Sequence, residues 1–250
     1  MRVAALYDIH GNLPALEAVL EDLHHADVDR VIVGGDVVVG PMSRETLGRL
    51  LNFDVPVQFI QGNCEVAVLA QMAGADPGPL PEQARAAVRW DAQQLQAEYE
   101  RVLASWPKTL RLDIPPFGEV LFCHGTPRNE NECFTRLTPE DRLLRIFEGV
   151  TVPLIVCGHT HMQFDRMVGP IRVVNAGSVG MPFGQPGADW LLLGPDVQLR
   201  HTRYDLAAAA ARVRATKYPQ AEDFAARYML QPPAEQTMLE LFAKADLNRA

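Results

Sequence analysis

Residues 2–12 read RVAALYDIHGN, and this stretch sets a pattern that recurs along the first two-thirds of the chain. Its apolar part, residues 2–7, predicts a buried strand, because short apolar runs bounded by turn residues are typical of strands. Asp8 and His10 follow, one residue apart, so an extended chain would point both side chains to the same face. Leucines at three- and four-residue steps over 13–26 then predict a helix.

Four more apolar runs end in polar residues in the same way. They occupy residues 30–34, 55–60, 119–123 and 153–157. Strands that alternate with helices are typical of the α/β class. Sites in such proteins form at the carboxyl ends of the strands, so we expect the polar residues there to converge. In chain order, these residues are Asp8, His10, Asp36, Asn63, His124, His159 and His161.

The rest of the chain supplies further helices and short strands. Between residues 163 and 203 the pattern changes to short strands joined by Gly/Pro turns. No repeat or change in composition marks a boundary. We therefore expect residues 1–250 to form a single domain, with the polar motifs over 8–161 and the helices of 205–247 packed on it. The expected helices occupy 82–105, 138–148 (capped by Thr138, with Pro139 at its first position), 205–217, 220–230 and 234–247.

The polar residues at the strand ends form a set of metal-binding type. Two Asp, one Asn and four His offer oxygen and nitrogen donors, which suit divalent Mn, Fe, Co, Ni or Zn. Any one of them alone could be an ordinary hydrogen-bonded loop residue. Burying all of them together without a cation would be costly. The glycines beside them would let the backbone pass close to an ion.

The order of the motifs resembles the calcineurin-like metallophosphoesterase family. Asp-x-His, Gly-Asp, Gly-Asn, a His-Gly pair and Gly-His-x-His follow one another from residue 8 to residue 161. The segment NAGSVG (175–180) is similar to the small bacterial and archaeal phosphodiesterase branch. The resemblance implies an α/β fold in which two mixed β-sheets pack as a sandwich flanked by helices. The strand–helix alternation alone would fit a doubly wound sheet equally well.

The resemblance also implies two divalent transition-metal ions, with manganese favoured and Fe, Ni, Co or Zn as alternatives. Asp36 would bridge the ions, and Asp36, His124 and Asn63 would be the catalytic residues. The implied reaction is in-line attack on phosphorus by a metal-bridging hydroxide. The two sets of terminal ligands would be Asp8, His10 and His161 for one ion, and Asn63, His124 and His159 for the other.

Cys64 departs from the pattern of many family members, which have His after the Gly-Asn pair. A thiol with an ordinary pKa of about 8.5 is a poor substitute for an imidazole that protonates a leaving group. The branch with Cys at this position resembles phosphodiesterases, so a phosphodiester is the expected substrate. A phosphomonoesterase or nucleotide pyrophosphatase is the alternative enzyme. A non-catalytic protein-interaction scaffold is the alternative of another class, since a retromer subunit resembles this fold.

Several polar residues near the motifs have open roles. Arg44, Arg128 and Arg136 could bind a substrate phosphate, although ordinary surface charge explains each of them equally well. Asn12 is expected to fix its loop rather than bind metal. His201 is expected on the exposed face of a strand.

Composition excludes some classes of function. The net charge is −8 and no basic run occurs, so a surface that coats nucleic acid is not expected. No run approaches the roughly 20 apolar residues that cross a membrane. The four cysteines show no CxxC pairing, which favours a reducing compartment and hence the cytoplasm. The expected partner is a small phosphoester, and the sequence leaves the oligomeric state open.

Overall fold

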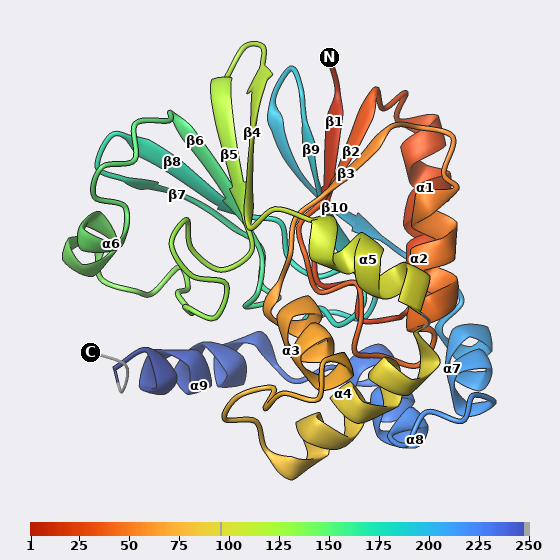
Figure 1. The fold of residues 1–250 in the computed structure, drawn as a ribbon. Helices are drawn as coiled ribbons and strands as arrows, with labels where there is room; N and C mark the ends of the chain where they lie inside the picture. The colour runs from red at the N-terminus through yellow and green to blue at the C-terminus, as the bar shows by residue number, and fades with distance from the viewer. Residues whose placement is uncertain (96, 248–250) are drawn as a thin grey trace.

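The computed structural model, which describes residues 1–95 and 97–247, contains two five-stranded sheets that face each other (Figure 1). In the first sheet, β1, β2 and β3 are parallel, and β9 and β10 are antiparallel to their neighbours. The sheet is therefore mixed, as expected. Its strands, in spatial order, are β10 (Val197–Thr202), β9 (Ala188–Leu193), β1 (Val3–Leu6), β2 (Arg30–Val33) and β3 (Val57–Phe59).

The second sheet has the same character. Its three central strands β5, β6 and β8 are parallel, and an antiparallel strand closes each edge. The prediction of two mixed sheets packed as a sandwich is thus confirmed. The strands, in spatial order, are β4 (Thr109–Ile114), β5 (Gly118–Cys123), β6 (Leu154–Cys157), β8 (Ile171–Asn175) and β7 (Phe164–Val168).

The core between the sheets is built from alternate strand residues. Val3, Ala5 and Tyr7 pack with Phe122 and Val156 of the opposite sheet. The intervening residues of the first strand belong to a separate apolar cluster shared with the helices. Both faces of the strand are therefore buried, which explains why the N-terminal segment is continuously apolar rather than alternating.

Helices cover the outer faces of both sheets. Five of the described helices contribute side chains to the apolar cluster of the first sheet. Another packs on the second sheet through Leu143 and Ile146. None of the helices that the structure describes is long and apolar enough to span a membrane. These helices are α1 (Leu13–His25), α2 (Ser43–Leu51), α3 (Asn63–Met72), α4 (Glu82–Gln94), α5 (Ala97–Ser105) and, on the second sheet, α6 (Glu140–Ile146).

In Figure 1 the C-terminal segment lies on either side of α3 and α4, with α9 to the left below the strands and α7 and α8 to the right. Its first part shares a small apolar core with Ala87 of α4, and Ala210, Val213 and Phe224 are among its buried members. The elements are α7 (Leu206–Arg214), α8 (Ala221–Phe224), a π-helical turn η1 (Ala225–Leu230) and α9 (Glu235–Leu247).

Two helix predictions differ from the structure. The helix expected over 82–105 is divided into α4 and α5, because Leu95 adopts extended angles (φ −86°, ψ 128°) and buries its side chain in the first apolar cluster. The helix expected from 138 begins at Glu140. The Thr138 hydroxyl accepts the Thr135 N–H at 3.0 Å, so Pro139 takes the N-cap position instead.

Candidate metal centre

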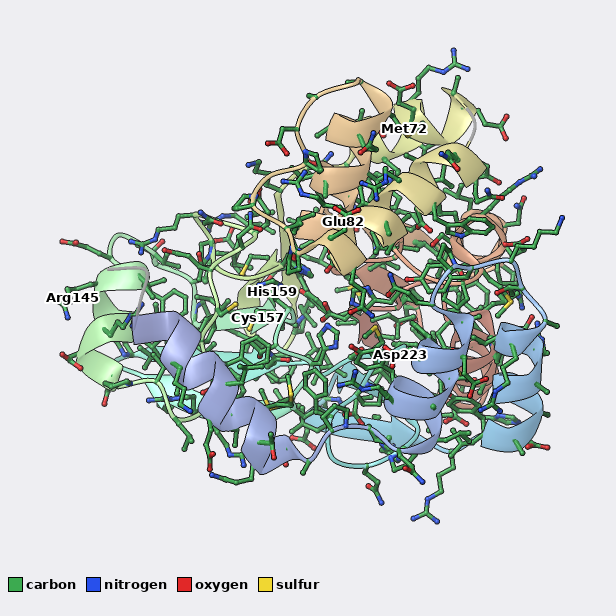
Figure 2. The ribbon with its side chains drawn as sticks, turned by 90° about the horizontal axis from the view of Figure 1, so that it is seen from below. Met72, Glu82, Arg145, Cys157, His159 and Asp223 are labelled. Atoms are coloured by element: carbon green, nitrogen blue, oxygen red, sulfur yellow. The ribbon has the colours of Figure 1, made fainter. Side chains whose placement is uncertain are left out.

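The seven ligand candidates converge where β1, β2, β3, β5 and β6 end. Among the described residues, two groups of three ligand candidates have their donor atoms within 4.8 Å of one another, and a third such group joins the Cys64 thiol to His10 and Asp36. Seen from below, His159 lies near the middle of the molecule (Figure 2). On one side are α3 and α4, labelled at Met72 and Glu82, and on the other is α8, labelled at Asp223. The two groups are Asp8, His10 and His161, and Asp36, His124 and His159.

The first group directs one oxygen and two nitrogens at a common point. His161 Nε2 lies 3.4 Å from Asp8 Oδ1 and 3.2 Å from His10 Nε2. The other nitrogen of His161, Nδ1, donates to the Met181 carbonyl at 2.9 Å. This bond places the proton on Nδ1 and leaves the Nε2 lone pair free to bind a cation.

The second group is organised around His124. Its Nε2 lies 3.0 Å from Asn63 Oδ1 and 3.4 Å from Asp36 Oδ2, while its Nδ1 donates to the Gly34 carbonyl at 2.9 Å. The His159 ring lies 5.0 Å from the His124 ring, centroid to centroid. As in His161, the hydrogen bond from Nδ1 places a proton on that nitrogen. Nε2 of His124 is therefore the nitrogen that faces the oxygens of Asn63 and Asp36.

Asp36 lies between the two groups. Its Oδ2 is 3.9 Å from His10 Nε2 on one side and 3.4 Å from His124 Nε2 on the other. Its Oδ1 accepts the backbone N–H of Cys64 at 2.8 Å, which fixes the orientation of the carboxylate. One carboxylate oxygen is thus directed at both groups, as a bridging ligand requires.

Asp8 provides the test of whether these residues fit a cation. Its side chain is fully buried, and its Oδ2 accepts the His159 backbone N–H at 2.8 Å. Its Oδ1 is buried and has no hydrogen-bond partner among the residues that the structure describes. An unpaired carboxylate oxygen in the interior is costly, and a divalent ion at this position would satisfy it. The donor set therefore fits a divalent metal.

The backbone at the ligands is left-handed, not extended. Asp8 (φ 53°), His10 (φ 47°) and Asp36 (φ 53°) have positive φ, as do His159 (φ 66°) and His161 (φ 58°). The expectation that extended alternation aligns Asp8 with His10 was therefore wrong. The chain turns sharply after each strand, and the turn brings the side chains together. Such conformations cost about 1 kcal/mol or more per residue and cluster at functional sites.

Glycines leave room for this approach of chain segments. A Cβ at Gly158 would lie 2.6 Å from Asp8 Oδ2, and a Cβ at Gly62 would lie 2.2 Å from Asp36 Oδ1. Both distances are impossible for a real side chain. The structure thus shows that these glycines make room for carboxylate oxygens, and their expected approach to a metal ion stays a prediction.

The electrostatics of the cluster are those of carboxylates close to imidazoles. Burial lowers the pKa of His124, but Asp36 and Asp8 outweigh it and raise the pKa to about 10. Burial and the neighbouring imidazoles lower the pKa of His10 and of His159 to about 4. The imidazolium of His124 keeps the pKa of the Asp36 carboxyl well below its usual range in spite of burial. A cation that binds here would replace the proton on His124.

Glu65 is a site residue for which the sequence predicted no role. It is fully buried, and its two oxygens accept backbone N–H groups of Asp36, Val37 and Gly62, each at 2.8 Å. The loop that carries Asp36 is thereby tied to the start of α3. The available signal was Glu at the third residue after the helix start, which is typical of a side chain that caps its own helix.

Cys133 is a second residue that the motifs did not reveal. Its Sγ lies 3.1 Å from His159 Nε2 and lines the same cavity as the ligands. Cys64 also lines this cavity, and its backbone N–H is the donor to Asp36 described above. Two half-buried thiols therefore border the candidate metal centre.

The three arginines are not brought to the ligand cluster. Arg128 forms a two-point ion pair with Glu132, with its shortest contact at 2.6 Å. Arg136 pairs with Glu235 of α9. Arg44 lines a different cavity, beside α2 and α4. Arg128 and Arg136 are held by acidic partners, and the position of Arg44 depends on the path of its chain segment. The local sequence predicts neither of these.

Two minor predictions have clear outcomes. Asn12 fixes its loop, as expected: its Nδ2 donates to the Gly180 carbonyl at 2.8 Å, and its Oδ1 caps α1. His201, expected on the exposed face of a strand, is only partly exposed. It lies opposite Asp189 in the β9–β10 pair, and its Nδ1 is 2.7 Å from Asp189 Oδ1, so the ring is half-buried.

The sequence also matches a known family. Residues 1–195 fit the model of the calcineurin-like phosphoesterase superfamily domain, which is more than three-quarters of the chain. The chain belongs to this family. A calcineurin-like phosphoesterase is a metal-dependent hydrolase of phosphoric esters, and the candidate ligand groups lie within the matched residues. The family resemblance noted in the motifs is thereby confirmed.

Individual relatives agree with this assignment. An uncharacterised protein of Methanocaldococcus jannaschii is 26% identical over 195 residues, which cover 72% of this chain and 76% of the relative. A metallophosphoesterase from Sphaerobacter thermophilus is 28% identical, with a TM-score of 0.69 over 91% of this chain and 98% of its own. A hypothetical protein from Pyrococcus horikoshii has the same fold, with 21% identity and a TM-score of 0.78 over 93% of this chain and 99% of its own.

Proposed function

We propose that this calcineurin-like phosphoesterase hydrolyses phosphodiesters with two divalent transition-metal ions, manganese being favoured. The observation that carries the proposal is the position of Asp36 between two groups of donors, beside the buried and unpartnered Asp8 Oδ1. Asp8, His10 and His161 would hold one ion, and Asn63, His124 and His159 the other. When bound, such ions lower the pKa of water and neutralise charge on the phosphoryl oxygens.

The protein's own residues contribute orientation and charge. Bonds to the Gly34 and Met181 carbonyls fix the rings of His124 and His161, so neither ring has to reorient during the reaction. In the reaction, an oxygen of water forms a bond to phosphorus and the bond to the leaving oxygen breaks. One proton of water goes to the leaving group and the other to solvent. The products are a phosphomonoester and an alcohol.

The preference for diesters rests on the charge of the cavity. The cavity beside the ligands has a volume of about 420 Å³, and none of the described residues that line it is Lys or Arg. A phosphodiester carries one negative charge, whereas a monoester carries nearly two at neutral pH, and no side chain here would neutralise the second. Cys64 borders the cavity where many relatives have His, and burial beside Asp36 raises the pKa of its thiol well above the ordinary value. It is therefore a weak proton donor to an alkoxide.

The test uses bis(p-nitrophenyl) phosphate and p-nitrophenyl phosphate on metal-stripped protein, with Mn, Ni, Zn or Mg added back. We expect metal-dependent turnover of the diester at least tenfold above that of the monoester. Asp36→Asn should lower kcat by two orders of magnitude or more and reduce the bound metal measured by elemental analysis. Full activity and metal content in Asp36→Asn would refute the dinuclear site. Faster turnover of the monoester would support a phosphomonoesterase, and no turnover of either ester by folded, metal-loaded protein would support the scaffold alternative.

A further inference from the structure

The cavity beside the candidate metal centre has two unlike walls. Ligand side chains form one wall, and the other is largely aromatic and comes from the C-terminal helices. The family model ends at residue 195, so α7, α8, η1 and α9 lie outside the matched region. These helices are therefore an addition to the matched family domain that borders the site directly. The aromatic residues that line the cavity are Phe224, Tyr228 and Phe242 from these helices and Tyr218 from the connection between α7 and α8.

The aromatic surface is continuous with a metal-ligand candidate. The Phe183 ring stacks on the His161 ring, with centroids 5.2 Å apart and planes 17° from parallel, and it also contacts Phe242 of α9 at 6.4 Å. Within the C-terminal segment, the Phe224 ring contacts those of Tyr218 at 6.3 Å and Tyr228 at 5.9 Å, centroid to centroid. Tyr218, Phe224, Tyr228 and Phe242 line the same cavity as the ligand candidates, so a group bound at the ligands would have aromatic rings within reach.

This wall is held in place by bonds to the body of the protein. The Gly184 N–H donates to the Pro233 carbonyl at 2.9 Å just before α9, and Glu235 at the start of α9 pairs with Arg136. Leu239 on the same helix is 1% exposed. The position of α9 is thus determined by polar and apolar contacts together, so Phe242 faces the cavity without needing a ligand to draw it in.

The chemistry of the wall selects an uncharged planar group. The polar side chains beside it, Gln220 of the C-terminal segment and Gln83 of α4, are neutral, and the lining that the structure describes contains no Lys or Arg. A second phosphate or a carboxylate would find no cation here. Aromatic rings in offset or edge-to-face contact gain about 0.5–1.5 kcal/mol beyond area burial. A cavity of about 420 Å³ also has room for a phosphate together with one ring system.

We propose that the C-terminal helices form a subsite for a planar aromatic substituent of the phosphodiester, either a simple aryl group or a nucleobase. This inference rests on the proposed function for the identity of the phosphodiester. Tyr228 and Phe242 are the specificity residues that can be tested, since both are half-buried and face the cavity.

The first measurement is equilibrium binding, which does not depend on turnover. Manganese-loaded protein is titrated by calorimetry with methyl phenylphosphonate and with methyl methylphosphonate, two monoanions that differ only in a phenyl group in place of a methyl group. We expect the phenyl compound to bind at least tenfold more tightly. Tyr228→Ala and Phe242→Ala should each reduce this advantage to threefold or less. Tyr228→Phe, which keeps the ring, should retain it.

Leu241→Ala is the matched control for Phe242→Ala. Leu241 also lies on α9, but it is 56% exposed and does not line the cavity. This variant should leave the advantage of the phenyl compound unchanged. Equal affinities for the two ligands in the unaltered protein, or an advantage that persists in both Tyr228→Ala and Phe242→Ala, would overturn the subsite. Circular dichroism confirms that each variant is folded.

A third ligand distinguishes the two kinds of aromatic group. The methyl ester of thymidine 5′-monophosphate should bind more tightly than the phenyl compound if the subsite accepts a nucleobase. Affinity between those of the other two ligands would assign it to a smaller aryl group. Tighter binding of the phenyl compound without hydrolysis of any diester would support the aromatic subsite and refute the proposed function. Hydrolysis of diesters with equal affinity for the two ligands would support the proposed function and refute the subsite.

Discussion

Asp8 and Asp91 show how single buried carboxylates are used differently in this protein. Asp8 has an unpartnered oxygen that faces the ligand cluster, so a cation can satisfy it. Asp91 of α4 is equally buried and also has one oxygen, Oδ1, without a hydrogen-bond partner among the described residues, but its Oδ2 accepts the backbone N–H of Val39, in the loop that follows Asp36. Val39 has a positive φ of 65°, and the bond to Asp91 holds this strained residue in position.

Asp91 leads to a prediction about pH. Burial raises its pKa from the ordinary value of 3.8 to about 7. The unfolded chain therefore loses this proton near pH 4, whereas the folded chain keeps it until about pH 7. The contribution of Asp91 to stability is thus complete below pH 4 and is lost as the pH rises through 7. The loss is on the order of 4 kcal/mol, since each unit of pKa corresponds to about 1.4 kcal/mol.

Urea denaturation of Asp91→Asn and of the unaltered protein between pH 4 and pH 8 checks this prediction. Asn does not titrate, so the variant should gain stability relative to the unaltered protein as the pH rises, by a few kcal/mol over the range. Other titrating groups are common to both proteins and cancel in the difference. A difference that stays constant with pH would show that Asp91 is ionised in the folded protein throughout.

At the scale of elements, Glu65 couples the β2–α2 loop to helix α3. Its side chain accepts the backbone N–H groups of Asp36 and Val37, which lie 29 and 28 positions earlier in the chain. It also accepts the N–H of Gly62, three positions earlier. Replacement by Gln would leave one oxygen acceptor and place an NH₂ group against backbone donors. We expect Glu65→Gln to reduce the free energy of unfolding by about 2–4 kcal/mol, because buried N–H groups lose their acceptors.

Guanidinium denaturation at pH 8 measures this loss. Glu119→Gln is the control, because Glu119 forms an exposed ion pair with Arg111 in the β4–β5 hairpin, and such pairs contribute at most about 1 kcal/mol. Metal affinity should fall 10- to 100-fold in Glu65→Gln, since Glu65 orients the backbone of Asp36. Equal stabilities of the two variants would show that the Glu65 contacts do not hold the loop.

For the molecule as a whole, the candidate metal centre lies where segments from both sheets meet, so a cation that binds there should stabilise the complete fold. An ion at 100 times its Kd adds about 2.7 kcal/mol by mass action. For a chain of this size, this corresponds to a rise in Tm of about 5–10 °C. Calorimetric scans with chelator and with increasing manganese measure the shift.

The metal-dependent rise should be absent in Asp8→Asn. In the metal-free state, this variant should be less stable than the unaltered protein, because the replacement removes a carboxylate charge that His161 and His124 stabilise in spite of burial. Asp165→Asn, which breaks an ion pair between Asp165 and Arg172 on the second sheet, should keep the full metal response. A Tm independent of manganese in the unaltered protein would contradict the metal centre.

The sequence alone was sufficient for the strand ends and the order of the motifs. The apolar runs before Asp8, Asp36 and His124 predicted β1, β2 and β5, because a buried strand needs only a few consecutive apolar residues and a turn. The glycines before Asn63 and His159 were also readable, since each excludes a side chain from a crowded point. These signals are local, and the resemblance to the family followed from their order.

Only the tertiary structure decided which distant groups meet. The Val39 N–H finds Asp91 52 residues later, Cys133 reaches His159 across 26 residues, and Arg136 pairs with Glu235 across 99. The break after α4 depends on a core site for Leu95, and the aromatic wall of the cavity depends on where α9 docks. No local pattern contains these contacts, because each depends on the packing of elements whose relative positions are set by the buried core of the whole chain.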